Sequence, residues 1–158
     1  MPDVSLNRSL RLGVHNLTDL CPQIGKFSVM RQIFGSGYKK AVASQKVRVS
    51  RAKMYAFIDD KKGTIVISSN YLKSGNQKHI LLDLIHEMVH IRQWREGKDL
   101  FDKKFKYVDR PTEIEAYRIA AKEAKRMGLG GRELEKYLKV DWVSKADSDR
   151  LLNKLGVK

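Results

Sequence analysis

Residues 84–94 read LIHEMVHIRQW, which places His86 and His90 four positions apart with Glu87 directly after the first. Residues i and i+4 lie on the same face of an α-helix, one turn apart, so two imidazoles with this spacing can bind one Zn²⁺ ion. The intervening glutamate is not expected to be a ligand, but it can reach a water molecule on the metal. This spacing predicts hydrolysis, in which zinc lowers the pKa of the water and polarises a carbonyl while Glu87 acts as general base.

The residues around the motif favour a cleft over solvent for its polar side. Residues 77–96 predict a helix, and residues 80–91 are Ile, Leu, Met or Val at nearly every position outside one polar arc. That arc contains Asp83, His86, Glu87, His90, Gln93 and Trp94. In a chain with 32 lysines and arginines, a solvated stripe should carry lysine, and this one carries none. The alternative interpretation is a buried helix with two satisfied histidines.

A catalytic zinc site usually needs a third protein ligand, and the remaining histidines do not provide one. No histidine follows His90, and the other two, His15 and His79, lie upstream. His79 is two turns before His86, or about 10 Å along the helix axis, which is too far to share the metal. We therefore expect a carboxylate as the third ligand, and a structural or cleft-edge position for His79.

The candidate carboxylate lies in the segment RPTEIEAYRIAAKEAKRMG, where Pro111 is well placed to open a helix. Glu113 is in its first turn, and the face that follows it carries small alanines, which allow a neighbouring helix to approach closely. Glu115 points about 200° away and is the rival ligand if the helix is rotated. The alternative for both glutamates is a favourable interaction with the helix dipole alone.

The two segments together resemble a gluzincin, a zincin metallopeptidase with two histidines and a glutamate on zinc. Glu113 lies 23 positions after His90, and its E-x-x-A-x-x-x-A pattern is similar to that of ImmA/IrrE-type and minimal single-domain gluzincins. The resemblance covers roughly residues 55–127. It implies a zincin-like fold and a metalloendopeptidase acting on peptides or proteins. It also implies one Zn²⁺ per chain on His86, His90 and Glu113, with Glu87 as general base.

The resemblance also implies an edge strand beside the active helix that binds extended substrate by strand addition. TIVIS, residues 64–68, occupies that place in the chain. Larger members carry an acid or Asn four residues beyond the ligand glutamate, where this chain has Tyr117. Tyr107 and Tyr117 are the candidates for stabilising an oxyanion.

The elements that must position these residues predict an α+β domain, with a small antiparallel hairpin sheet packed on the active-site helix and the glutamate helix. Leucine spacing predicts a helix over 5–20, capped by Ser5 or Asp3 and ended by Pro22. The other expected elements are a helix at 28–34, a turn at 35–37, strands at 46–59 and 64–68, a helix at 77–96, a loop at 98–110, and helices at 111–127, 131–138 and 144–155.

The whole chain, residues 1–158, is expected to be one domain. It divides into a basic helical N-terminal region (1–45), a catalytic core (46–127) and a C-terminal helical tail (128–158). The tail is expected to pack on the core through leucines and aromatic residues, including Trp142. A sharper hypothesis is that it covers the cleft and keeps the enzyme latent, with Asp141 near the metal.

The charge and the cysteine content of the chain indicate an alternative function and a cellular setting. The formal net charge is +14, and residues 1–55 contain ten lysines and arginines but only two acidic residues. Such a basic excess attracts polyanions, so the alternative function is a non-catalytic module that associates with nucleic acid, with structural metal or none. A single cysteine fits a reducing setting. No signal peptide or membrane-spanning run is evident, so we expect a cytoplasmic protein, and its oligomeric state stays open.

Overall fold

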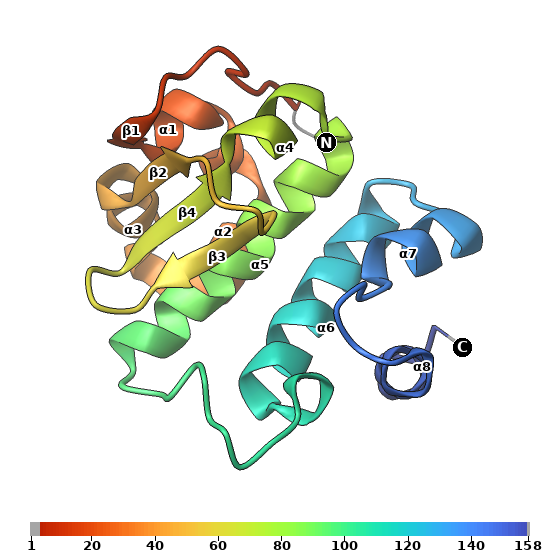
Figure 1. Cartoon of the computed structure of the whole chain (residues 1–158). Coiled ribbons are helices and arrows are strands. Elements are labelled where there is room, and N and C mark those ends of the chain that lie inside the picture. Colours follow the sequence, from red (N-terminus) through yellow and green to blue (C-terminus); the bar gives the residue numbers. More distant parts are fainter. Residues whose placement is uncertain (1–3, 158) are drawn as a thin grey trace.

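The computed structural model describes residues 4–157 as a mixed sheet with helices beside it (Figure 1). The strands are β1 (Gly13–Asn16), β2 (Lys46–Ser50), β3 (Ala56–Asp59) and β4 (Thr64–Ser68). The α-helices are α1 (Leu17–Leu20), α2 (Ser28–Phe34), α3 (Tyr38–Ser44), α4 (Ser69–Ser74), α5 (Gln77–Arg95), α6 (Pro111–Arg126), α7 (Gly131–Leu138) and α8 (Lys145–Lys154). Short 3-10 turns cover Ile24–Lys26, Gly35–Gly37 and Tyr107–Asp109. The α+β class predicted from the sequence is confirmed.

Helix α5 lies between two hydrophobic clusters, and α6 runs beside it (Figure 1). Most of its apolar residues, such as Leu84 and Ile85, belong to the cluster that it shares with the sheet and α1–α3. Leu82 instead joins the cluster formed by α6, α7 and α8. A helix that is apolar on most sides can be stable only when it is covered on most sides, which is why His86, Glu87 and His90 lie deep in the molecule.

The sheet is mixed, which corrects the expectation of a small antiparallel sheet. Its strand order is β1-β2-β4-β3, with β2 parallel to β4 and the other two pairs antiparallel. The single strand expected over 46–59 is two strands, because residues 51–55 leave the sheet and β4 is inserted between β2 and β3. Only the β3–β4 part of the predicted hairpin forms, closed by a turn in which Gly63 has a φ of +65°.

The expectation that TIVIS is the edge strand was wrong, because it forms β4 in the interior of the sheet. Every residue of β4 is buried, as its five successive apolar or hydroxyl side chains allow. The edge strand beside α5 is β3, which hydrogen-bonds only to β4. Trp94 fixes its position, because its indole nitrogen donates to the Asp60 carbonyl and its ring covers Gly63, where a Cβ would lie only 2.3 Å from the ring.

The N-terminal segment also differs from expectation, because no helix covers 5–20. Residues 13–16 form β1, and only Leu17–Leu20 are helical. Gly13 has a φ of +127°, which a helix does not permit, and its strand pairs with β2. The guanidinium of Arg8 holds the irregular part by donating to the Leu72 and Gly75 carbonyls at 3.1 and 2.9 Å. The alternative cap residue, Asp3, lies outside the described residues.

The other long elements agree with the sequence. The helices expected at 28–34, 77–96, 111–127, 131–138 and 144–155 are all present within a residue or two, and residues 98–106 are irregular. Helices α3 and α4 were not predicted. Both are short and draw their stability from packing more than from their own sequence.

The N-terminal and C-terminal regions are both part of the packed structure. Leu17, Ile24 and Met30 are fully buried in the core that includes the sheet and α5. The tail contributes Leu138 and Leu151 to the second cluster, where they contact residues of α5 and α6. No helix within residues 4–157 is both long enough and apolar enough to cross a membrane.

Candidate metal centre

Three buried side chains from two helices converge at the centre of the molecule. His86 and His90 lie one turn apart on α5, and Glu113 lies in the first turn of α6. The Oε1 atom of Glu113 is 3.0 Å from Nε2 of His86 and 3.1 Å from Nε2 of His90, and the two imidazole nitrogens are 3.1 Å apart. This group could hold a metal ion.

The close approach of α6 to α5 depends on small side chains. Ala116 and Ala120 follow Glu113 at the E-x-x-A-x-x-x-A positions, and both are completely buried. Pro111 opens the helix at its first position, where its missing N–H has no cost. Glu113 therefore enters the protein interior directly from the helix end, as the sequence predicted.

The rival carboxylate, Glu115, lies outside this group but close behind it. It accepts hydrogen bonds from the Gln93 side-chain amide at 2.8 Å and from the Arg92 guanidinium. The same Gln93 amide donates to the Thr112 carbonyl at 3.0 Å. Glu115 therefore supports the site through Gln93, and the geometry favours Glu113 as the ligand.

Gln93 determines which nitrogen of His90 faces the group. Both partners of the Gln93 amide nitrogen are acceptors, so its carbonyl oxygen must face Nδ1 of His90, 2.7 Å away. Because that oxygen can only accept, Nδ1 carries the proton and Nε2 of a neutral His90 presents a lone pair. Such a hydrogen bond to the outer nitrogen is the usual support for a metal-binding histidine.

The donor set fits a cation, because lone pairs and a carboxylate converge at distances where they would otherwise repel. When no metal ion is bound, a proton on His90 can supply this charge. Burial opposes charge on His90, but the Glu113 carboxylate outweighs it and raises the pKa of His90 to about 9. Burial likewise opposes charge on Glu113, yet its two histidine neighbours hold the pKa of Glu113 well below its usual range. A divalent ion bound by two imidazoles and one carboxylate would satisfy all three groups.

Glu87 lies on the same face of α5 but outside the metal group. Burial raises the pKa of Glu87 to about 8, and the neighbouring His90 charge opposes this shift. A carboxylate in such an environment holds a proton more readily than an exposed one. Without a metal ion Glu87 therefore holds a proton at neutral pH, and its role as general base stays a prediction for the metal-loaded protein.

Asp83 lines the cleft one turn earlier but serves a structural purpose. Its two oxygens accept hydrogen bonds from the hydroxyl of Tyr71, on α4, and from that of Tyr137, on α7, the latter at 3.0 Å. Burial raises the pKa of Asp83 to about 6, although both hydroxyls favour the charged form. His79 packs its ring on Tyr137 with centroids 5.3 Å apart, which agrees with the structural or cleft-edge position expected for it. These contacts fasten the tail to α5.

Tyr107 and Tyr117 lie together beside the metal group. Their hydroxyl oxygens are 2.8 Å apart, and the Tyr117 ring packs against the His86 ring with centroids 4.4 Å apart. Burial raises the pKa of both hydroxyls above the usual range, so both stay protonated. One hydroxyl donates its hydrogen to the other oxygen, so the hydrogen of the second hydroxyl is available to a group in the cleft. Nδ1 of His86 has no hydrogen-bond partner among the described residues, so ring packing holds this histidine.

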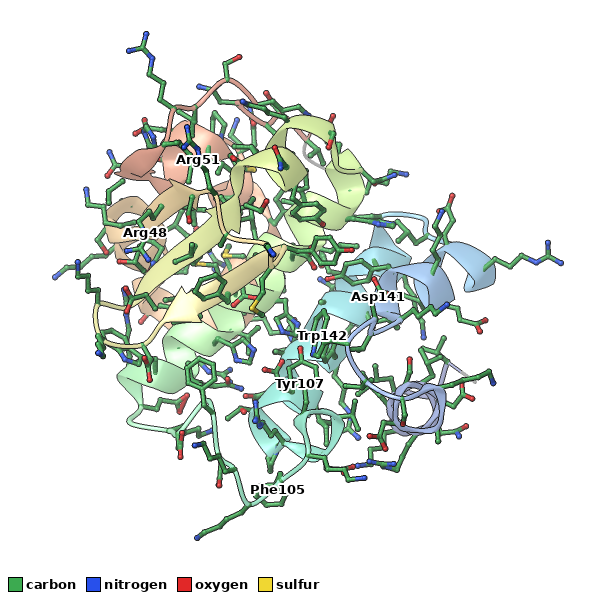
Figure 2. The ribbon with its side chains drawn as sticks, viewed as in Figure 1. Arg48, Arg51, Phe105, Tyr107, Asp141 and Trp142 are labelled. Carbon is green, nitrogen blue, oxygen red and sulfur yellow. The ribbon has the colours of Figure 1, made fainter. Side chains whose placement is uncertain are left out.

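A cleft of about 230 Å³ opens from these side chains to the surface. Its floor contains His86, Glu87, His90 and Glu113, and one wall is the edge strand β3 with Met54 and Tyr55 before it. Asp83 of α5 and Tyr117 of α6 also line it, and the remaining lining residues come from the segments after α5 and α7. Figure 2 shows Tyr107 and Trp142, from these two segments, close together.

Several cleft residues were not identified from the sequence. Met54, Tyr55, Phe101, Arg110 and Trp142 all line the cleft. The only sequence signal was the presence of large aromatic residues in loops, where they are not needed for a core. The sequence placed Trp142 in the packing of the tail, but its side chain is 54% exposed.

Asp141, proposed from the sequence as a residue near the metal, is not among the cleft-lining residues. It accepts a hydrogen bond from the Tyr55 hydroxyl at 3.4 Å instead. The tail therefore reaches the cleft through Trp142.

Comparisons of the chain with models of protein families, with curated proteins and with solved structures found no match.

Replacing Gln93 with leucine is expected to lower metal affinity by about 10- to 100-fold, because the outer nitrogen of His90 loses its acceptor. A metal-competition titration against a coloured chelator measures this. Glu96→Gln is the control, since Glu96 lies at the end of the same helix, 47% exposed, and pairs with Arg92. Equal affinity of the Gln93 variant and the wild type would show that Gln93 does not support the site.

Proposed function

We propose that this protein is a zinc-dependent metallopeptidase of gluzincin type. The observation that carries the proposal is the convergence of His86, His90 and Glu113 at one point, with Glu87 beside them in an open cleft. Two imidazoles and a carboxylate form a catalytic zinc donor set, which leaves a fourth position for water or substrate.

The side chains of the cleft have distinct roles in the proposed reaction. His86, His90 and Glu113 would hold the ion, which when bound supplies a Lewis acid that activates water and polarises a peptide carbonyl. Glu87 accepts the proton of the attacking water and passes it to the leaving amine. The free hydroxyl hydrogen of the Tyr107–Tyr117 pair donates to the negative charge that develops on the carbonyl oxygen.

The edge strand supports binding of an extended peptide. β3 is paired with β4 along one side only, and its residues Ala56, Phe57 and Ile58 line the cleft along the other. A peptide can therefore add to β3 as a further strand, with its backbone held beside Glu87. β3 takes the place that the resemblance assigned to TIVIS.

The test measures metal content and hydrolysis together. Elemental analysis of purified protein supplied with zinc should give about one zinc per chain. The zinc-loaded protein should hydrolyse bonds in a denatured protein substrate, followed by mass spectrometry, and a chelator should abolish this. Restoration by added zinc would link the two measurements. Zinc binding without hydrolysis of any peptide tested would contradict the proposal.

Nucleic-acid association is a second candidate, favoured by a basic hollow away from the cleft. The exposed side chains of Arg11, Arg51 and Lys73 line it together with Ser9, Ser69 and Asn70, and it has a volume of about 490 Å³. No acidic side chain is among the described residues that line it. Such a surface attracts phosphates through counterion release.

Replacing Arg11, Arg51 and Lys73 with glutamate is expected to weaken binding to labelled duplex DNA at least tenfold and to flatten its salt dependence, since these contacts release counterions (order of magnitude). The control changes three exposed lysines elsewhere, Lys103, Lys122 and Lys125, and alters net charge equally. Fluorescence anisotropy at several salt concentrations measures the DNA affinity of both triple variants. Equal losses in both variants would mean that only total charge matters.

A further inference from the structure

Most of the exposed large apolar side chains of the described residues line the cleft. Met54, Tyr55, Phe101 and Trp142 are each between 44% and 54% exposed, and all four line it. Scattered exposed apolar residues are normal on a protein surface, but a concentrated group marks a binding site. The other exposed large apolar residues of the described chain are Leu12, Val14 and Phe105, none of which lines the cleft.

These four residues come from three separate segments. Met54 and Tyr55 precede β3, Phe101 lies in the loop after α5, and Trp142 lies in the loop between α7 and α8. Trp142 packs against Tyr107 with ring centroids 5.3 Å apart. The Tyr55–Asp141 hydrogen bond joins the loop of Trp142 to the segment before β3. The apolar walls are therefore held in place around the floor that carries Glu87.

The cleft walls offer little free positive charge to an acidic substrate side chain. Its acidic residues, Asp83, Glu87 and Glu113, lie beside the two histidines, and Arg110 is the only lysine or arginine that lines it. The Arg110 guanidinium is already engaged, since its Nε donates to the Asp102 carbonyl at 3.2 Å and it lies 5.8 Å above the centre of the Tyr107 ring. In a protein of net charge +14, the cleft is thus lined by apolar side chains and contains few of the lysines and arginines found elsewhere.

We propose that the cleft selects peptide segments with a large, uncharged apolar side chain next to the bond to be cleaved, and that Phe101 and Trp142 determine this specificity. This inference rests on the proposed peptidase function. The apolar side chain would fill the space between the walls and exclude water from the bond that Glu87 serves. The tail then forms part of the substrate site through Trp142, in contrast to the latency hypothesis.

The test separates binding from turnover by using zinc-loaded Glu87→Gln protein. Short fluorescein-labelled peptides that differ only in one central residue, leucine, phenylalanine, alanine or glutamate, are titrated by fluorescence anisotropy. We expect the leucine and phenylalanine peptides to bind at least about tenfold more tightly than the alanine peptide, with glutamate weakest. Phe101→Ala and Trp142→Ala, in the same background, should remove this preference.

Phe105→Ala is the matched control. Phe105 lies in the same loop as Phe101 and is equally exposed, at 42% against 44%, but it does not line the cleft. Figure 2 shows it at the far end of the loop, away from Trp142. The control should keep the preference. Equal binding of all four peptides, or equal effects of the three alanine variants, would overturn the inference.

Intrinsic fluorescence supplies a second readout, because the chain has two tryptophans, Trp94 and Trp142. Binding of the leucine peptide should change the emission of the Trp94→Phe variant and leave that of Trp142→Phe unchanged. Hydrolysis by the wild type is then measured with the same peptides. Turnover without apolar preference would refute this inference alone. Selective binding without any turnover would refute the peptidase, and with it the position of the apolar side chain next to a cleaved bond.

Discussion

Replacing Glu87 with glutamine is expected to reduce peptide hydrolysis by at least about 100-fold while the protein keeps its fold and its zinc. Glutamine has nearly the same shape but cannot accept a proton from water. Glu87 is outside the group of metal donors, so zinc content should stay at the wild-type value. The measurements are initial rates on the peptide that the wild type cleaves best, elemental analysis and circular dichroism.

Glu123→Gln is the control for this experiment. Glu123 is also a buried carboxylate, 3% exposed, but it lies near the other end of α6 and pairs with Arg126. Its neutralisation should leave the rate within about threefold of the wild type, within the usual scatter of single-site effects remote from a site. Full hydrolysis by the Glu87 variant would remove Glu87 from the mechanism and require another base.

Glu87→Gln is also expected to change how the stability of the metal-free protein depends on pH. Burial raises the pKa of Glu87 to about 8 in the folded state, so the folded protein holds this proton more tightly than the unfolded chain. The stability associated with this group is complete at low pH and is lost as the pH rises toward 8. In urea unfolding, the free energy of unfolding of Glu87→Gln should therefore rise relative to that of the wild type as the pH increases from about 5 to about 8.

The second large effect is expected at Glu113. Glu113→Ala and the isosteric Glu113→Gln should each lower zinc affinity by more than about 100-fold. Removal of a ligand is expected to weaken binding more than removal of a residue that only hydrogen-bonds to a ligand, such as Gln93. The charged oxygen that lies 3.0 Å from His86 and 3.1 Å from His90 would be gone. Elemental analysis after dialysis should then find no zinc, and hydrolysis should fail with it.

Glu115→Ala is the matched variant, two positions along the same helix. It removes one partner of Gln93, which still donates to the Thr112 carbonyl, so zinc should be retained. Zinc lost only from the Glu115 variant would reverse the assignment of the ligand. Folded wild type that takes up no zinc even when zinc is supplied would make the motif an ordinary buried helix.

The sequence determined the features that depend on local spacing. Histidines four apart on a strongly apolar helix meet wherever that helix is placed, and Pro111 and Gly128 delimit α6 by their backbone preferences. The sequence also made Glu113 the candidate to meet the two histidines, because the alanines on its face allow a neighbouring helix to approach closely, although Glu115 stayed a rival until the packing of α6 was known. The tail helices α7 and α8 were likewise evident from their periodicity.

Tertiary structure decided the sheet and the walls of the cleft. Leu6, Leu10 and Val14 have helical spacing, yet Leu6 and Leu10 pack from an irregular segment while Val14 stands 61% exposed on a strand. Spacing cannot show which strand will be an edge, because pairing between distant segments is settled by the total burial of the sheet.

The same reason applies to the residues that support the candidate metal group and line the cleft. The contact of Gln93 with Glu115 needs two helices in register, and the apolar walls need Tyr55, Phe101 and Trp142 from three loops. None of these contacts has a local sequence signature, since each depends on where packing brings distant segments together. The sequence by itself therefore specified the candidate metal-binding side chains, and the fold alone decided what surrounds them.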